Sequence, residues 1–136
     1  MRNWRKNAHP MDVLQAFVAA LAGYYDEHGS EKEISQQRAV NLIAKVPTII
    51  ASWDRVRNDK EPIPPNPNLS HASNFLYMLK GEEPDKELER IFDVCLILHA
   101  DHTFNASTFA AREVASTRAH MYSAVSAAVG ALSGDR

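Results

Sequence analysis

The chain has 136 residues, of which 45% are hydrophobic. This length allows one domain that buries roughly two thirds of the surface of the unfolded chain, and this composition excludes general disorder. With 15 Lys and Arg residues against 17 Asp and Glu residues, the formal charge is only −2, which offers no broad field for nucleic acid or an anionic membrane.

The single cysteine and the lack of long apolar runs favour a cytoplasmic protein. Cys95 alone forms neither an intramolecular disulfide nor a thiolate metal cluster. No apolar segment reaches the roughly 20 residues of a membrane span, and the first residues lack a signal-peptide core. The only basic stretch, Arg2 to Lys6, is short and is interpreted as a solvated terminus rather than a phosphate-binding arm.

Two helices are predicted in the first half of the chain. One begins with Pro10 at its first position and continues to Tyr25. The next is capped by Ser30, with Glu33 as capping-box partner, and Pro47 should kink it rather than end it. Its apolar stripe is long enough to require burial on more than one side, and consists of Val40, Leu42, Ile43, Val46, Ile49, Ile50, Trp53 and Val56.

A proline-rich segment separates this helix from a shorter one. Residues 59–68 contain four prolines, which block helix formation, so this stretch is predicted to be a stiff connector rather than a proline-rich recognition motif. Ser70 then caps a helix that runs through Leu79, and Gly81 ends it.

The remaining helices are predicted from a change in composition. One starts at Pro84-Asp85 and continues to Leu98, with an apolar face that should be buried and with Cys95 as a small buried hydrophobe. From Ala106 to Leu132 small residues dominate, which predicts one or two closely packed helices divided near Ser116-Thr117. With no strand pattern or repeat, the sequence predicts an all-α array of about six helices, with residues 1–136 as a single helical segment.

A cluster of polar residues follows the fourth of these helices. His99, Asp101, His102 and Asn105 would bring two imidazoles, a carboxylate and a carboxamide into one small volume. A metal site is one interpretation, because residues 99 and 102 would share a face if the helix continued, but no fourth ligand is identifiable. A hydrogen-bonded helix terminus explains the same residues.

The same cluster also resembles a known family. His99-Ala100-Asp101-His102, followed by Asn105-Ala106-Ser107-Thr108-Phe109, looks like the oxaloacetate-binding segment of citrate synthases. Residues 9–14, His-Pro-Met-Asp-Val-Leu, and residues 69–79, Leu-Ser-His-Ala-Ser-Asn-Phe-Leu-Tyr-Met-Leu, agree with that family in order and spacing. The resemblance covers nearly the whole chain and implies an internal fragment of the large helical domain, after which the family's catalytic Leu-His-Gly-Gly-Ala-Asn motif would follow.

The resemblance assigns roles to individual residues. His102 would donate a hydrogen bond to oxaloacetate, and Asn105 would line the same pocket. His99 and Asp101 would orient His102 and close the helix end. For His71 a local role at a helix start and a role near the pocket remain open. No catalytic or metal-binding residue is assigned.

A core or interface position is expected for one further histidine, His120, rather than a catalytic role.

At the level of function, the resemblance implies an acyltransferase that condenses acetyl-CoA with oxaloacetate to give citrate and CoA. The closely similar 2-methylcitrate synthases use propionyl-CoA, and the residues leave this choice open. The resemblance further implies a homodimer that uses acyl-CoA as substrate and no cofactor, with neither nucleic acid nor membrane as a partner. The chain alone should be inactive.

A stand-alone helical interaction or regulatory module derived from the same scaffold is the alternative. A small metal- or nucleic-acid-binding protein is a third hypothesis, which lacks both the ligand count and the charge.

Overall fold

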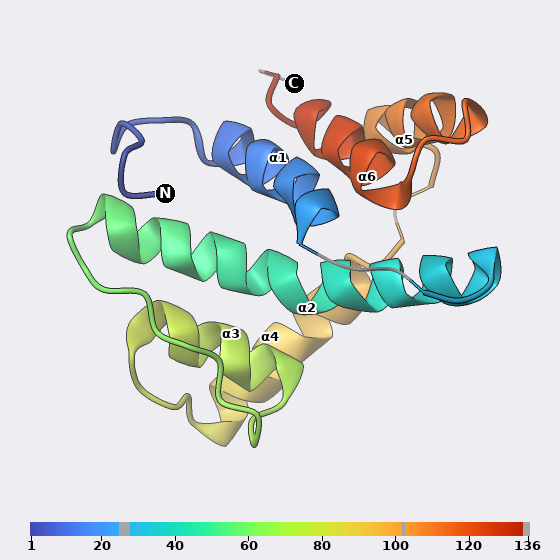
Figure 1. Ribbon diagram of the computed structural model, residues 1–136. Coiled ribbons are helices and arrows are strands. Elements are labelled where there is room, and N and C mark those ends of the chain that lie inside the picture. The colour runs from blue at the N-terminus through green and yellow to red at the C-terminus, as the bar shows by residue number, and fades with distance from the viewer. Residues whose placement is uncertain (25–27, 102, 135–136) are drawn as a thin grey trace. The chain divides into compact units, whose positions relative to one another are not determined.

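The helices observed agree with the predicted fold class. A computed structural model describes residues 1–24, 28–101 and 103–134, and these residues form six α-helices, one short 3-10 helix and no strand (Figure 1). The all-α prediction is confirmed. The elements are α1 (Pro10–Ala20), the 3-10 helix η1 (Leu21–Gly23), α2 (Glu31–Arg57), α3 (His71–Lys80), α4 (Lys86–Leu98), α5 (Ala106–Ser116) and α6 (Met121–Gly130).

The chain folds into two compact units. Unit 1 consists of Met1–Asn7 and Pro47–Thr103, and unit 2 consists of Ala8–Val46 and Phe104–Arg136. Helix α2 contributes to both, because the boundary falls inside it at Pro47. The helix continues through this proline, so the prediction that Pro47 would not end it is confirmed.

Helix α1 begins at Pro10 as predicted, and its first turn is closed by an unexpected residue. The backbone N–H of Met11 donates to Nδ1 of His9 over 3.3 Å, which makes His9 the N-cap. The last turn tightens into η1 instead of continuing as α-helix, as is common at helix ends. Tyr25, where the helix was predicted to end, lies outside the described residues.

The predicted capping box at the start of α2 is present. The N–H of Glu33 donates to Ser30 Oγ over 3.4 Å, while the N–H and hydroxyl of Ser30 both donate to Glu33 Oε2 over 2.9 and 2.7 Å. These hydrogen bonds, from the Ser30 hydroxyl first and its backbone second, lower the pKa of Glu33 from its ordinary value of 4.5.

Helices α3 and α4 have the predicted ends. Ser70 Oγ accepts from the N–H of Ser73 over 3.2 Å, and Asp85 Oδ1 accepts from the N–H of Leu88 over 2.8 Å. Gly81 ends α3 with a left-handed backbone (φ 96°) and donates its N–H to Tyr77 O over 2.8 Å. A side chain at this position would be strained, which is the physical reason for glycine there.

The small-residue segment is divided, as predicted, directly after Ser116. Helix α6 packs against both α5 and α1 (Figure 1). Its contact with α1 is close at Gly130, where an added Cβ would lie 2.5 Å from Gln15 Nε2. Ser126 Oγ also donates to Gln15 O over 3.1 Å. Small residues therefore allow the close approach for which they were predicted.

The core of unit 2 lies between α1, α2 and α6. Val18, Leu42 and Tyr122 are buried together, and half-buried apolar residues surround them, namely Leu14, Leu21, Val46, Met121 and Val125. The phenol of Tyr122 reaches the edge of this core, where Asn41 Nδ2 donates to its oxygen over 3.4 Å. The hydroxyl therefore remains hydrogen-bonded although the ring is buried.

In unit 1, the proline-rich loop is fixed to the helices at both of its ends. Arg55 Nε donates to Glu61 O over 2.6 Å and its Nη1 donates to Leu79 O over 3.4 Å. At the other end, the N–H of Asn66 donates to Asn74 Oδ1 of α3 over 3.0 Å. The residues buried in this unit come mainly from the second half of α2 and from α3, and are Ile49, Ala51, Trp53, Ala72, Ser73, Leu76 and Met78.

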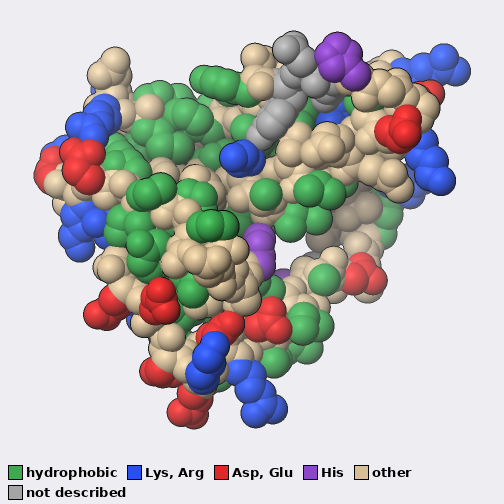
Figure 2. Space-filling model, turned by 60° about the horizontal axis from the view of Figure 1, so that its bottom comes forward, with side chains coloured by type: hydrophobic (Ala, Val, Ile, Leu, Met, Phe, Trp, Pro, Cys, Tyr) green, Lys and Arg blue, Asp and Glu red, His purple; other side chains and the backbone are tan. Residues whose placement is uncertain are grey.

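Two predictions of burial are wrong, the first of them only in part. In the first half of α2 the apolar stripe is buried on one side only, because Val40 and Ile43 are exposed while Leu42 is buried. Burial on more than one side is found only in the second half, where Ala51 and Trp53 are both buried although they lie on opposite faces. In α4 no residue is buried, and Cys95 is exposed. Apolar side chains accordingly lie at the surface among charged ones (Figure 2). Periodicity predicts which side chains share a helix face but not whether another element covers that face.

The lengths and apolar content of the helices can also be compared with those of a membrane span. Among residues 1–24, 28–101 and 103–134, no helix is both long and apolar enough to span a bilayer.

Candidate functional site

The predicted polar cluster begins where α4 ends. Helix α4 stops at Leu98, and His99 is its C-cap, with its N–H donating to the carbonyls of Cys95 and Leu96 over 3.1 and 3.2 Å. Residues 99–101 are not helical, so the helix does not continue as the metal-site interpretation required. The helix ends here because its last carbonyls are satisfied by this cap.

The ring of His99 also binds this helix end. Its Nδ1 lies 2.7 Å from Cys95 O. Since a carbonyl oxygen only accepts, Nδ1 carries the proton, and in the neutral ring Nε2 is left as an acceptor. The expectation that His99 closes the helix end is met by these contacts, and they fix the orientation of the ring.

Asp101 forms a local turn rather than a contact with a helix. Its Oδ1 accepts from the N–H of Thr103 over 3.3 Å. Thr103 has a left-handed backbone with φ 58°, an uncommon conformation for a β-branched residue. Backbone of this kind is concentrated at functional sites. His102, to which the main contact with oxaloacetate was assigned, lies outside the described residues.

Asn105 is the N-cap of α5. Its Oδ1 accepts from the N–H of Thr108 over 2.8 Å, and the side chain is half-buried. The carbonyl end of the carboxamide is therefore engaged by the helix, and the two N–H groups of Nδ2 are its remaining donors. His99 and Asp101 belong to unit 1, whereas Asn105 belongs to unit 2.

A group of aromatic and cationic side chains near Asn105 in the sequence was not predicted. Phe104 and Phe109 meet edge to face with ring centroids 6.3 Å apart, and the guanidinium of Arg112 lies 5.1 Å from the centroid of Phe104. Arg112 thus brings a positive charge to the segment that starts α5. The sequence contained one signal for this group, the spacing of Phe109 and Arg112, because residues three apart are neighbours on a helix.

His71 is the first residue of α3 and is exposed. The cap at this helix start is its neighbour Ser70, so the capping role considered for His71 is filled by another residue. His120 is half-buried and caps α6, with Nδ1 accepting from the N–H of Ser123 over 3.2 Å. The ring of His120 also meets Tyr122 edge on, at 6.0 Å between centroids, which is a structural role.

A metal site is not assembled within the described part of the chain. No group of three or more His, Cys, Asp or Glu side chains in residues 1–24, 28–101 and 103–134 is arranged to hold an ion. The three-residue set considered from the sequence includes His102 and so lies partly outside these ranges.

Comparison with known proteins gives the same family for the whole chain. The family model described as citrate synthase, C-terminal domain, matches residues 1–136. The citrate synthase of a Synechocystis species is 46% identical over 135 residues, which cover 98% of this chain and 34% of that protein. The 2-methylcitrate synthase of Mycobacterium tuberculosis is 43% identical over 128 residues, which cover 94% of this chain and 32% of that protein.

Solved structures agree with the sequence comparison. The citrate synthase of Pyrobaculum aerophilum superimposes with a TM-score of 0.88 at 45% identity, over 96% of this chain and 35% of that one. The chain thus spans about a third of the length of the relatives that it matches. With a match over all 136 residues, this chain belongs to the citrate synthase family.

Proposed function

We propose that the chain supplies part of the oxaloacetate-binding site of a synthase that condenses acyl-CoA with oxaloacetate. The observation that carries this proposal is the match of all 136 residues to the citrate synthase C-terminal domain, with the segment from His99 to Phe109 inside it. The relatives include proteins named citrate synthase and 2-methylcitrate synthase. Both acetyl-CoA and propionyl-CoA are therefore kept as candidate second substrates.

The proposed contacts with oxaloacetate come from His102 and Asn105. An imidazole N–H is a good donor to a keto oxygen or a carboxylate. Asn105 can contact an anionic substrate only as a donor through Nδ2, because its Oδ1 already accepts from the N–H of Thr108. In the proposal, His99 and Asp101 position His102, and the left-handed backbone of Thr103 supports a functional constraint on this segment.

These contacts are too few for the chain to act alone. One hydrogen bond to a charged group contributes about 1.5–3 kcal/mol, which by itself corresponds to a dissociation constant of roughly 10–100 mM. We assign no catalytic residue to these 136 residues. In the proposal, the reaction proceeds by general acid–base and electrostatic catalysis in the cytoplasm and uses acyl-CoA as a substrate, without a metal or cofactor.

A chimaera tests the proposal. Residues 1–136 replace the aligned segment of the Pyrobaculum aerophilum citrate synthase, and release of CoA is measured with both substrates present. We expect turnover by the chimaera and none by residues 1–136 alone. His102→Ala in the chimaera should lower kcat/KM by about 10- to 100-fold, the equivalent of one charge-assisted hydrogen bond.

Asn105→Asp separates binding from folding. Aspartate caps a helix as well as asparagine does, so α5 should keep its stability, which circular dichroism on heating checks. The new carboxylate faces the substrate in place of the Nδ2 donors and should raise KM for oxaloacetate by about tenfold or more. Asn105→Ser, which also caps, is the uncharged control. An active chimaera that tolerates both His102→Ala and Asn105→Asp would contradict the proposal.

The second candidate function is a stand-alone helical interaction module that self-associates. It is favoured by the exposed apolar side chains of α4, which are Ile91, Val94, Leu96, Ile97 and Leu98. Light scattering at high concentration should give a dimer, and Ile97→Lys should dissociate it. A strictly monomeric chain counts against this function and against the homodimer that the resemblance implies.

Reading the gene beyond codon 136 separates the two functions. A frame that continues into a Leu-His-Gly-Gly motif favours the synthase, and a stop codon favours the module.

A further inference from the structure

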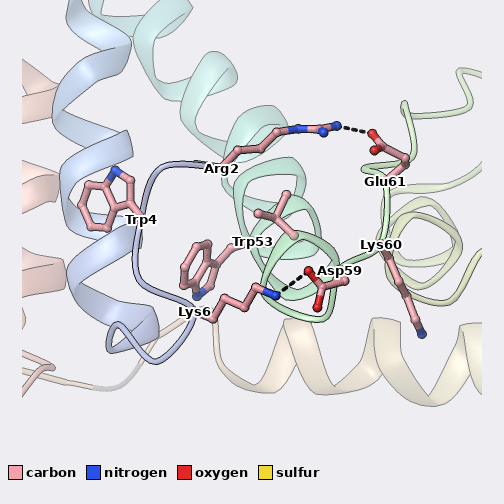
Figure 3. Close-up of a pocket in the computed structure, with 8 residues that line it drawn as sticks. Arg2, Trp4, Lys6, Trp53, Asp59, Lys60 and Glu61 are labelled. Atoms are coloured by element: carbon pink, nitrogen blue, oxygen red, sulfur yellow. Dashed lines mark hydrogen bonds and ion pairs between the residues drawn. The ribbon is translucent and has the colours of Figure 1, made fainter.

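The first residues of the chain are tied to the start of the proline-rich loop that follows α2. Arg2 pairs with Glu61 and Lys6 pairs with Asp59 (Figure 3). The basic stretch is exposed, as predicted for a solvated terminus, and it belongs to unit 1. The contacts span 59 and 53 residues of sequence, so no local pattern indicates them.

A cavity of about 250 Å³ lies beneath this segment. Its apolar lining comes from Trp4, Trp53 and Val56, and the two ion pairs frame its rim. Figure 3 shows both ion pairs, with the ring of Trp53 drawn beside Lys6. An apolar cavity of about 150 Å³ holds a benzene molecule, so this one has room for a substituted six-membered ring.

The indole N–H of Trp53 lacks a partner in this lining. Trp53 is 4% exposed, and its Nε1 has no hydrogen-bond partner among the described residues. Buried polar groups in proteins are nearly always paired, so this orphan requires an explanation. Because an indole N–H only donates, the missing group is an acceptor.

The charges at the rim favour a neutral molecule. The cations Arg2 and Lys6 are each matched by a carboxylate, and the side chain of the third cation, Lys60, points away from the ring of Trp53 in Figure 3. All four paired side chains are 60–77% exposed, so these pairs contribute little and rearrange easily.

We propose that this cavity binds a small, neutral, planar molecule whose carbonyl or ring nitrogen accepts a hydrogen bond from Trp53 Nε1. Its ring packs against the indole of Trp53 and the methyl groups of Val56. This site is independent of the proposed oxaloacetate site, because none of its residues belongs to the segment from His99 to Phe109.

The two tryptophans provide a direct test. A ¹H–¹⁵N spectrum of the chain shows two indole signals, one for each tryptophan, which Trp4→Phe assigns. The probe is benzamide, a neutral planar ring with one carbonyl. A molecule this small binds with a dissociation constant of roughly 10 mM, so the titration extends to about 50 mM. We expect a saturable downfield shift of the Trp53 indole proton, and weaker binding of benzoate.

Val56→Phe provides the control on location. It fills the cavity but keeps the indole N–H, and it should weaken benzamide binding by about tenfold or more. Val94→Phe makes the same substitution on the exposed face of α4 and should leave binding unchanged. No shift of the Trp53 signal, an equal shift in Val56→Phe, or tighter binding of benzoate than of benzamide would each overturn the proposal.

Discussion

Helices α3 and α4 are consecutive in unit 1 and start in the same manner, but they differ in burial. Each begins with a side-chain oxygen on the N–H three residues later, from Ser70 in α3 and from Asp85 in α4. In α3, Leu76 and Met78 are buried along with two smaller residues, whereas α4 has no buried residue. Equal capping therefore accompanies very different packing.

The contact between the two helices explains where the difference arises. They pack side by side through stacked rings of Phe75 and Phe92, with centroids 5.2 Å apart and planes 13° apart. After Phe92, every residue of α4 is exposed, and Ile97 and Leu98 reach 66% and 72%. Helix α4 is thus held by its first half only. Amphipathic sequence makes a face suitable for burial, but a neighbouring element is needed to bury it.

The largest expected effect tests the difference in burial between α3 and α4. Leu76→Ala removes a side chain that is 7% exposed and should lower the free energy of unfolding by about 2–5 kcal/mol, since it leaves a cavity. Leu98→Ala makes the same change in α4 and should stay within about 0.5 kcal/mol of the parent. Urea unfolding followed by circular dichroism measures both. Similar losses for the two variants would show that the second half of α4 is covered in solution.

The turn between the helices should show an intermediate effect. Gly81→Ala forces a side chain into a left-handed backbone and places its Cβ 3.3 Å from Ile63 Cδ1. We expect a loss of about 1–2 kcal/mol in the free energy of unfolding. The control is Gly23→Ala, where an added Cβ meets nothing within 4 Å and should be neutral or slightly stabilising. If Gly81→Ala is equally harmless, the end of α3 is not fixed as described.

Helix ends could be predicted from the sequence because their physics is local. Ser30 and Glu33, Ser70, and Asp85 each act on groups within three or four residues, so spacing alone identifies them. Burial of α4 could not be predicted, because it depends on elements distant in sequence. The exposed position of Cys95 is the clearest example.

The candidate site shows the same difference between local contacts and contacts distant in sequence. Its segment was found by resemblance, and the comparisons confirm the family. That Asn105 caps α5 follows from a local contact with Thr108, three residues later. The cavity at Trp53 was missed, because the ion pairs between the first residues and the loop after α2 join side chains more than fifty residues apart.

The smallest expected effect concerns the polar link between the two helices. Ser70 Oγ donates to Glu89 Oε1 over 2.5 Å, and Lys86 Nζ donates to Oε2 over 3.0 Å. These hydrogen bonds, from Ser70 first and from Lys86 second, lower the pKa of Glu89 from its ordinary value of 4.5. A carboxylate with a lowered pKa in the folded state stabilises the protein above its unfolded pKa, and this stabilisation is lost as the pH falls through the folded pKa.

Glu89→Gln should therefore lower the urea midpoint slightly at about pH 6, and the difference from the parent should shrink towards about pH 3. Lys86→Met removes the lesser cause of the shift and should reproduce only part of this pH dependence, since Ser70 still donates to the carboxylate. A difference between the parent and Glu89→Gln that stays constant from about pH 6 to about pH 3 would mean that Glu89 is not held by Ser70 in solution. In that case the stacked rings of Phe75 and Phe92 would have to join α3 to α4 without this polar link.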